Sequence, residues 1–265
     1  MSQLIVDEIM LREPNLLVPG KKPVGSLKID WNNKNTAHLV NLWGLGTNLG
    51  SCLKDRVGVA PGINGGLEIQ RGSLYQPGSN QYATVGNVST FGFHKNDRRW
   101  TAVIQLRFDD YNTDDFGVIV GSTISSASKG FCIWYENRTS QGSPHRLMQY
   151  MAPGTTGNSV SIAHNGFVSD SNLHTYVFRS DGAVAGDTGS LWIDGALVST
   201  VDGTIETPST TTTDMAYAAR IGMAEQYPTL IMPMEIPLIA FFNEALSDGG
   251  CQSLSLDPYQ FLIPA

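Results

Sequence analysis

The stretch Ser190-Leu191-Trp192-Ile193-Asp194-Gly195-Ala196-Leu197-Val198 identifies the class of fold. Apolar residues of high strand propensity lie on both sides of the dipeptide Asp194-Gly195. This dipeptide readily adopts the positive φ angles that a two-residue turn between strands requires. The stretch therefore predicts a β-hairpin, whose two strands are antiparallel.

Outward from this hairpin, strand signals recur at regular intervals, because β-branched and aromatic residues alternate with clusters of Gly, Asn, Asp and Ser. The further predicted strands span residues 100–108, 116–120, 130–135, 145–151, 159–164, 174–179, 218–222 and 237–242. The polar run 207–213 predicts a loop. Ser247 can cap a short C-terminal helical turn that ends before Pro258. Many strands with so little helix predict an all-β, two-sheet antiparallel jelly-roll sandwich.

Composition agrees with one large β domain. Of the 265 residues, 41% are hydrophobic and 15% are charged, with 28 Gly and 13 Pro, a balance typical of many strands joined by turns. The net charge of −7 argues against a nucleic-acid partner, because phosphate backbones are bound by clustered Lys and Arg. No apolar run reaches the length of a membrane span, so none is predicted.

The first thirty residues differ from the rest of the chain. Three prolines between Pro14 and Pro23 remove backbone donors and disfavour helix. We predict an extended N-terminal arm over residues 1–30 and the jelly-roll domain over residues 31–265, with Trp31 anchoring the arm at the junction. The arm either tucks against its own domain or docks on a partner subunit. It lacks the apolar core of a secretory signal, which predicts synthesis in the cytoplasm.

The three cysteines, Cys52, Cys132 and Cys251, lie far apart and have no metal-ligand spacing. An odd number without a tight pattern favours buried thiols, as in a protein made in a reducing compartment. One disulfide plus one free thiol is the alternative.

Several segments carry a family resemblance. Residues 173–179 (LHTYVFR) and 189–195 (GSLWIDG) resemble the paired strands of laminin-G-like domains of the concanavalin A-like superfamily. Residues 239–248 (IAFFNEALSD) resemble the last strand of these domains. Residues 256–261 (LDPYQF) resemble an ending common in laminin-G-like proteins of bacteriophages and prophages, and residues 15–31 are similar to the arm that opens those proteins. The chain departs from the family at Thr175, Tyr176 and Asp257-Pro258-Tyr259.

The resemblance implies a non-enzymatic virion structural protein, such as a decoration, fibre or tail-associated protein. Such a protein would be a homo-oligomer in the virion, attached to other virion proteins through its arm or a sheet edge, and its lectin-like jelly roll could also contact host-surface glycans. The alternative is a carbohydrate-binding module of a bacterial cell-associated protein. The acidic composition favours neutral sugars or protein neighbours over polyanionic glycans.

We predict no catalytic residues. Jelly-roll glucanases place a Glu-x-Asp-x-x-Glu motif on one strand, which brings carboxylates together on the concave face. That spacing is absent from the sequence, and G-x-S-x-G is absent too. A glycoside hydrolase or lyase is therefore the least favoured alternative. His174 is predicted to be packed or hydrogen-bonded at a sheet margin rather than to act as a base.

Two kinds of binding residue are candidates. Sugar sites stack an aromatic ring on the sugar face, and the candidate surface rings are Tyr75, Tyr111 and Tyr135, whereas Trp43, Trp100, Trp134 and Trp192 are predicted in the core. Calcium favours oxygen-rich loops, and calcium is the one cofactor that the sequence suggests. Its candidate ligands are Asp109, Asp110, Asp114 and Asp115, for which a solvated turn is the alternative.

Overall fold

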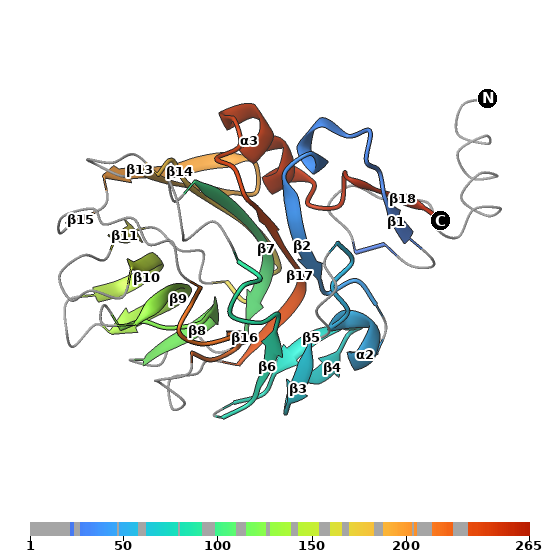
Figure 1. Cartoon of the computed structure of the whole chain (residues 1–265), viewed down its shortest axis with the longest axis horizontal. Helices are drawn as coiled ribbons and strands as arrows, with labels where there is room; N and C mark the ends of the chain where they lie inside the picture. The colour runs from blue at the N-terminus through green and yellow to red at the C-terminus, as the bar shows by residue number, and fades with distance from the viewer. Residues whose placement is uncertain are drawn as a thin grey trace.

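The strands of the computed structural model form two large antiparallel sheets that pack face to face, and one short separate pair (Figure 1). This arrangement confirms the predicted all-β sandwich. The structure describes residues 22–23, 27–46, 48–57, 62–78, 80–91, 99–109, 115–125, 128–138, 143–153, 160–165, 170–182, 188–202, 204–205, 214–224 and 233–265.

The first sheet, which we call the β9 sheet, has the strand order β15 (Thr204–Ile205), β11 (Val160–Asn165), β10 (Ser143–Pro153), β9 (Lys129–Arg138), β8 (Asp115–Gly121), β16 (Ala219–Ile221), β6 (Tyr82–Val85) and β3 (Ile63–Gly65). The second, the β7 sheet, has the order β14 (Ala196–Asp202), β13 (Thr188–Ile193), β12 (His174–Ser180), β7 (Trp100–Phe108), β17 (Met234–Phe242), β5 (Ser73–Gln76) and β4 (Glu68–Gln70). Strand β2 (Leu39–Trp43) also pairs with β17.

The main core lies between the two sheets. Because side chains alternate across a strand, Phe131, Ile133 and Tyr135 of β9 all face the β7 sheet and belong to this core. An aromatic group forms its centre, where the Phe91 ring lies 5.2 Å from the Phe241 ring and 5.9 Å from the Trp43 ring, measured between centroids. The predicted burial of Trp43, Trp100 and Trp192 is confirmed, while Trp134 is only partly buried.

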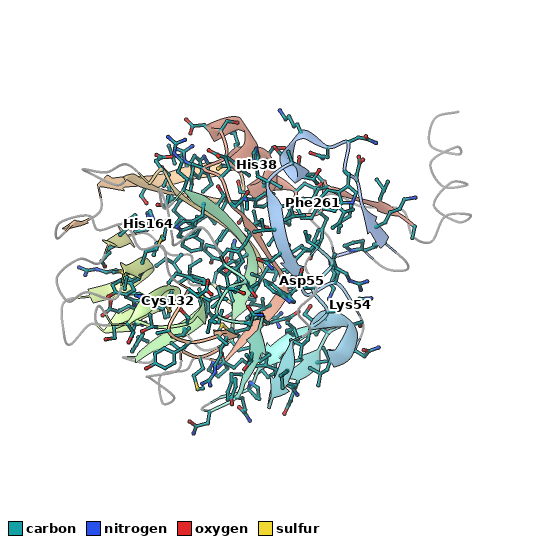
Figure 2. All side chains as sticks on the ribbon, viewed as in Figure 1. His38, Lys54, Asp55, Cys132, His164 and Phe261 are labelled. Carbon is teal, nitrogen blue, oxygen red and sulfur yellow. The ribbon has the colours of Figure 1, made fainter. Side chains whose placement is uncertain are left out.

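A second apolar layer covers the outer face of the β7 sheet. All nine residues of β17 are buried, and three that point away from the main core, Leu238, Ala240 and Phe242, belong to an apolar cluster with residues of helix α3 (Asp248–Leu256) and the C-terminal segment. Phe242 packs against Phe261, with ring centroids 6.3 Å apart, and Figure 2 labels Phe261 in this layer. The buried hydroxyl of Tyr259 donates to Gln105 Oε1 at 2.5 Å.

The predicted hairpin is confirmed. Asp194 and Gly195 have φ angles of 48° and 88°, as a two-residue turn requires. The turn is attached to α3, since Gly195 N donates to Ser255 Oγ at 2.9 Å. The predicted helix cap is also present, because the Ser247 side chain accepts from Gly250 N.

Near the N-terminus, β1 (Leu27–Ile29) pairs with β18 (Leu262–Pro264), and the pair stands beside the sandwich in Figure 1. Among the described residues before position 58, the helices are η1 (Lys34–Thr36) and α2 (Leu49–Cys52). Lys22 donates to the backbone carbonyl of Gly72. Residues 1–21 lie outside the described residues, so the division into an arm and a domain stays a prediction, and the polar run 207–213 also lies outside them.

Two further expectations can be compared with the structure. The cysteines are all buried and free, as predicted. Trp31, in contrast, is 60% exposed, and its role as the anchor of the arm stays a prediction, because residues 1–21 lie outside the described residues. Within the described part of the chain, no helix combines the length and the apolar character needed to cross a membrane.

Candidate functional site

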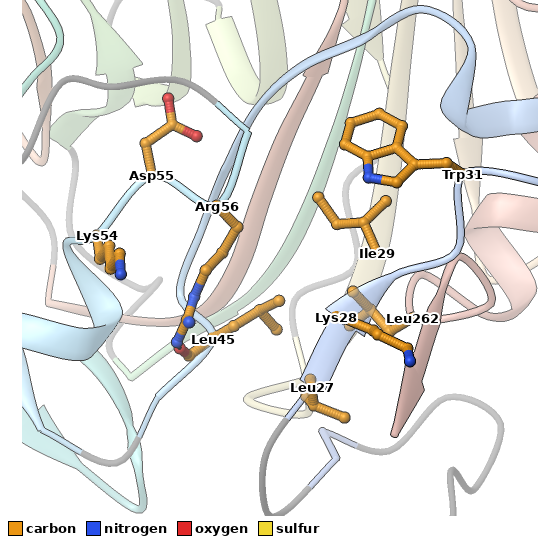
Figure 3. Close-up of a pocket in the computed structure, with 9 residues that line it drawn as sticks. All are labelled: Leu27, Lys28, Ile29, Trp31, Leu45, Lys54, Asp55, Arg56 and Leu262. Carbon is orange, nitrogen blue, oxygen red and sulfur yellow. The ribbon is translucent and has the colours of Figure 1, made fainter. Parts of the chain in front are cut away.

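A surface groove of about 490 Å³ lies between the β1–β18 pair and the segment that follows α2. Figure 3 shows Lys54, Asp55 and Arg56 on one side of it and Ile29 and Trp31 on the other. The described residues that line the groove are Leu27, Lys28, Ile29, Trp31, Leu45, Lys54, Asp55, Arg56 and Leu262. The groove therefore joins three parts of the chain that are distant in sequence.

The polar wall is held in place by Asp55, whose side chain points into the protein and is 5% exposed. Its Oδ1 accepts from the backbone N–H groups of Leu42 and Val57, both at 3.0 Å. Its Oδ2 accepts from Asn41 Nδ2 at 2.8 Å. Three donors thus fix this carboxylate against β2, and the flanking residues Lys54 and Arg56 are exposed.

The opposite wall is formed by β1 and the turn after it. Asp30 Oδ1 accepts from Asn32 N at 3.0 Å, which closes a local turn of the kind that Asp side chains favour. Asp30 N donates to Phe261 O at 2.8 Å, so the turn is attached to the C-terminal segment. Trp31 lies within this turn, and its indole borders the groove (Figure 3).

The groove has a local charge opposite in sign to that of the whole chain. Lys28, Lys54 and Arg56 line it, and none of them has a carboxylate within ion-pairing distance among the residues that the structure describes. The lining acid, Asp55, is already occupied by three N–H donors. A net charge of −7 therefore does not describe this part of the surface.

The three predicted ligand-binding tyrosines have different positions. Tyr75, on β5, is partly buried, and burial together with a hydrogen bond to Asp109 raises its pKa. Tyr135 is fully buried, with its ring centroid 4.8 Å from that of Phe108, so the prediction of a surface ring at Tyr135 is wrong. Its position two residues after Ile133 places it on the core face of β9. Tyr111 lies outside the described residues.

The predicted calcium loop is described only in part. Asp109 is exposed, and its Oδ1 lies 3.3 Å from Arg107 Nε. Asp110 and Asp114 lie outside the described residues, and of Asp115 only the strand backbone is described. Among the described residues, no group of three or more His, Cys, Asp or Glu side chains could hold a metal ion. The calcium site stays a prediction.

An ionic cluster lies on the outer face of the β7 sheet. Glu235 is opposite Arg107 on one neighbouring strand and opposite Tyr75 on the other. Its carboxylate forms ion pairs with Arg107 and, at 3.2 Å, with Arg71. Burial raises the pKa of Glu235, and Arg71 opposes this effect. Two guanidinium groups around one carboxylate are typical of a structural ion pair.

Two histidines have contrasting surroundings. His174 Nδ1 lies 2.5 Å from Asp194 Oδ2 and Nε2 lies 2.9 Å from Asp170 Oδ1, so its predicted role as a hydrogen-bonded strand residue is confirmed. The hydrogen bond to Asp194 raises the pKa of His174. His164 is fully buried between Gln149 and Ser199, and burial lowers its pKa to about 4.

Sequence reasoning missed the groove. The sequence predicted that Trp31 anchors the arm, and no motif connects it with Lys54, Arg56 or Leu262. A turn-forming Asp-Trp-Asn-Asn at residues 30–33 was the one available signal that the ring is exposed.

The fold is thus that of a two-sheet, lectin-like β-sandwich. No protein-family model matches the sequence, and no curated protein sequence matches it. Solved structures do match, among them a mutant of Trypanosoma rangeli sialidase displaying trans-sialidase activity. It is 16% identical with a TM-score of 0.58, and the match covers 83% of this chain and 33% of that chain.

Two botulinum neurotoxin structures are also similar. The type C toxin is 13% identical with a TM-score of 0.59, and the match covers 84% of this chain and 51% of that chain. The binding domain of toxin DC in complex with rat synaptotagmin II is 13% identical with a TM-score of 0.56, over 83% of this chain and 51% of that chain. The chain spans about a third to a half of these proteins. At such identities the likeness shows the fold alone.

Proposed function

We propose that this chain is a non-enzymatic glycan-binding domain and that the groove beside Trp31 is its binding site. The observation that carries the proposal is the 60% exposed indole at the edge of a concave site that also presents polar side chains. Aromatic rings stack on the apolar faces of sugars, while a few polar groups fix the orientation of the ligand.

The similar structures are compatible with this function. Cell entry of the type C neurotoxin is dependent upon interaction with two ganglioside molecules, and the Trypanosoma rangeli protein is a sialidase. Because the chain spans only part of each, their ligands support the proposal by analogy with the fold. The isolated acidic residues in the sequence support a binding role rather than paired-carboxylate hydrolysis.

The proposal is tested by a glycan-array screen followed by calorimetry on the best ligand. Replacing Trp31 by Ala should weaken binding by about tenfold, since aromatic stacking contributes on the order of 1 kcal/mol beyond area burial. The matched control is Ile63→Ala, which removes a 69% exposed apolar side chain outside the groove. Unchanged affinity in Trp31→Ala would place the site elsewhere.

The same screen should be run with calcium and then with a chelator. Binding that needs calcium would favour the loop of Asp109, Asp110, Asp114 and Asp115 as the ligand site instead of the groove. Binding that is insensitive to the chelator agrees with recognition by Trp31.

The resemblance to phage proteins suggests the biological setting, and we propose that the domain is part of a bacteriophage virion and attaches through its arm. The pairing of β1 with β18 supports this, because it secures residues 27–29, at the end of the proposed arm, to the domain. Deleting residues 1–23 should leave the domain folded and abolish attachment to the particle. Attachment that survives the deletion contradicts this role. Light scattering measures whether the protein is a homo-oligomer.

A further inference from the structure

The charges of the groove indicate which glycans it prefers. We propose that it binds a saccharide that carries a single carboxylate, of the uronic or sialic acid kind, with the carboxylate against Arg56 and Lys54 and the sugar ring against Trp31. This inference rests on the proposed function and narrows its ligand class.

The first argument is the state of the lining charges. Lys54 and Arg56 form one wall, on the strand-like segment whose intervening acid, Asp55, turns inward to its three donors. No carboxylate of the described residues pairs with Lys28, Lys54 or Arg56. An anionic group of the ligand would form ion pairs with these cations without displacing an internal ion pair.

The second argument is the position of Arg56. Its Nη2 donates to the backbone carbonyl of Leu45 at 2.6 Å, and its backbone N donates to Leu42 O at 3.0 Å. A guanidinium carries five N–H donors in a planar fork that matches a carboxylate. Because one donor already holds the side chain against the floor of the groove, less side-chain entropy is lost when the ligand binds.

The third argument limits the number of charges on the ligand. The whole chain carries a net charge of −7, so a long polyanion is repelled wherever it extends beyond the groove. Screening confines the attraction of the groove cations to roughly 8 Å at physiological ionic strength. One carboxylate beside one or two sugar rings fits these conditions better than a sulfated polymer does.

The experiment uses ligand pairs that differ in charge at the carboxylate. Calorimetry on the full chain compares galacturonate with its methyl ester, and sialyllactose with its methyl ester, so that each pair differs by one carboxylate charge. In at least one pair the acid should bind about tenfold more tightly or better, because hydrogen bonds to a charged group are markedly stronger than neutral ones. Arg56→Gln should abolish this preference and leave the affinity for the neutral partner within about twofold, which is about 0.4 kcal/mol.

Lys34→Gln is the matched control, since Lys34 is an exposed cation on η1 outside the groove lining. Urea unfolding of each variant checks that the fold is kept. Equal binding of acid and neutral partners in both pairs overturns the inference while Trp31-dependent binding still supports the proposed function. If the wild-type protein binds no glycan in a way that depends on Trp31, both the inference and the proposed function are overturned. Tight binding of heparin that persists in Arg56→Gln also overturns the inference, because it indicates unspecific attraction of polyanions.

Discussion

The carboxylate of Asp55 stabilises one wall of the groove, and its removal gives a measurable prediction. It accepts one hydrogen bond from the Asn41 side chain and two from backbone N–H groups of Leu42 and Val57. In Asp55→Ala all three donors lose their acceptor in a region where the aspartate was 5% exposed. We expect the free energy of unfolding to fall by about 3 kcal/mol, at roughly 1 kcal/mol for each buried donor left unpaired.

Asp55→Asn separates charge from geometry. In Asp55→Asn, the new side-chain oxygen can accept both backbone hydrogen bonds, from Leu42 and Val57. The new amide nitrogen then faces Asn41 Nδ2, and these two groups are both donors, so no hydrogen bond forms between them. If Asn41 turns its amide over, its Oδ1, which has no partner in the described structure, accepts the new bond, and its nitrogen becomes unpaired instead. One unpaired donor predicts a loss of about 1 kcal/mol, so the order of stability is wild type, Asp55→Asn, Asp55→Ala.

Urea unfolding followed by tryptophan fluorescence measures these differences, with Lys54→Ala, an exposed neighbour, as the control. The loss of about 3 kcal/mol corresponds to a melting temperature lower by about 6–12 °C for a domain of this size. Glycan affinity should fall along with stability in Asp55→Ala, because Lys54 and Arg56 lose their support. A loss below about 1 kcal/mol in Asp55→Ala would refute the reasoning, since it would mean that water satisfies the donors at little cost.

Three further predictions concern the histidines and the hairpin. His164 is buried and its pKa is lowered to about 4, so between pH 6.5 and 4 its ring is protonated in the unfolded chain but neutral in the folded protein. The free energy of unfolding should therefore fall by up to about 1.4 kcal/mol per pH unit as the pH is lowered from 6.5 towards 4, and His164→Gln should flatten this part of the curve of stability against pH. The pKa of His174 is raised by Asp194, so its contribution is complete below the unfolded-state pKa of about 6.5 and is lost as pH rises through the folded-state pKa; the stability difference between wild type and His174→Gln should be larger at pH 5.5 than at pH 8, and NMR titration of the ring checks the direction. Gly195→Ala places a Cβ 2.4 Å from Leu256 Cδ2 at a φ of +88°; because that leucine is 60% exposed and can move, the loss should be mainly the backbone cost of about 1 kcal/mol, and Gly195→Asn should lose less.

Local sequence signals predicted the second half of the fold well. The strand over residues 100–108 agrees with β7, and the turn at Asp194-Gly195 and the cap at Ser247 are present. Each of these depends on neighbouring residues, namely alternation along a strand, a turn dipeptide or a capping hydroxyl. The strands from β2 to β6 were not predicted, because most are only three to five residues long and give little alternation to read.

Burial of single aromatic residues was harder to predict. Tyr135 was expected at the surface and lies in the core, while Trp31 was expected to anchor the arm and is exposed. The residue type says only that a large ring gains from burial. Which ring is buried depends on the face of the strand that meets the other sheet, and on what covers the turn that carries it.

By itself, then, the sequence determined the fold class, the hairpin and the C-terminal cap, since these follow from local patterns and composition, and it favoured buried thiols over a disulfide. The groove was decided only by the tertiary structure. Its described lining comes from residues 27–29, 31, 45, 54–56 and 262, which are brought together by the pairing of β1 with β18 and by the attachment of Asp55 to β2. Such long-range pairings satisfy backbone and carboxylate hydrogen bonds in three dimensions and leave no periodic pattern in the sequence.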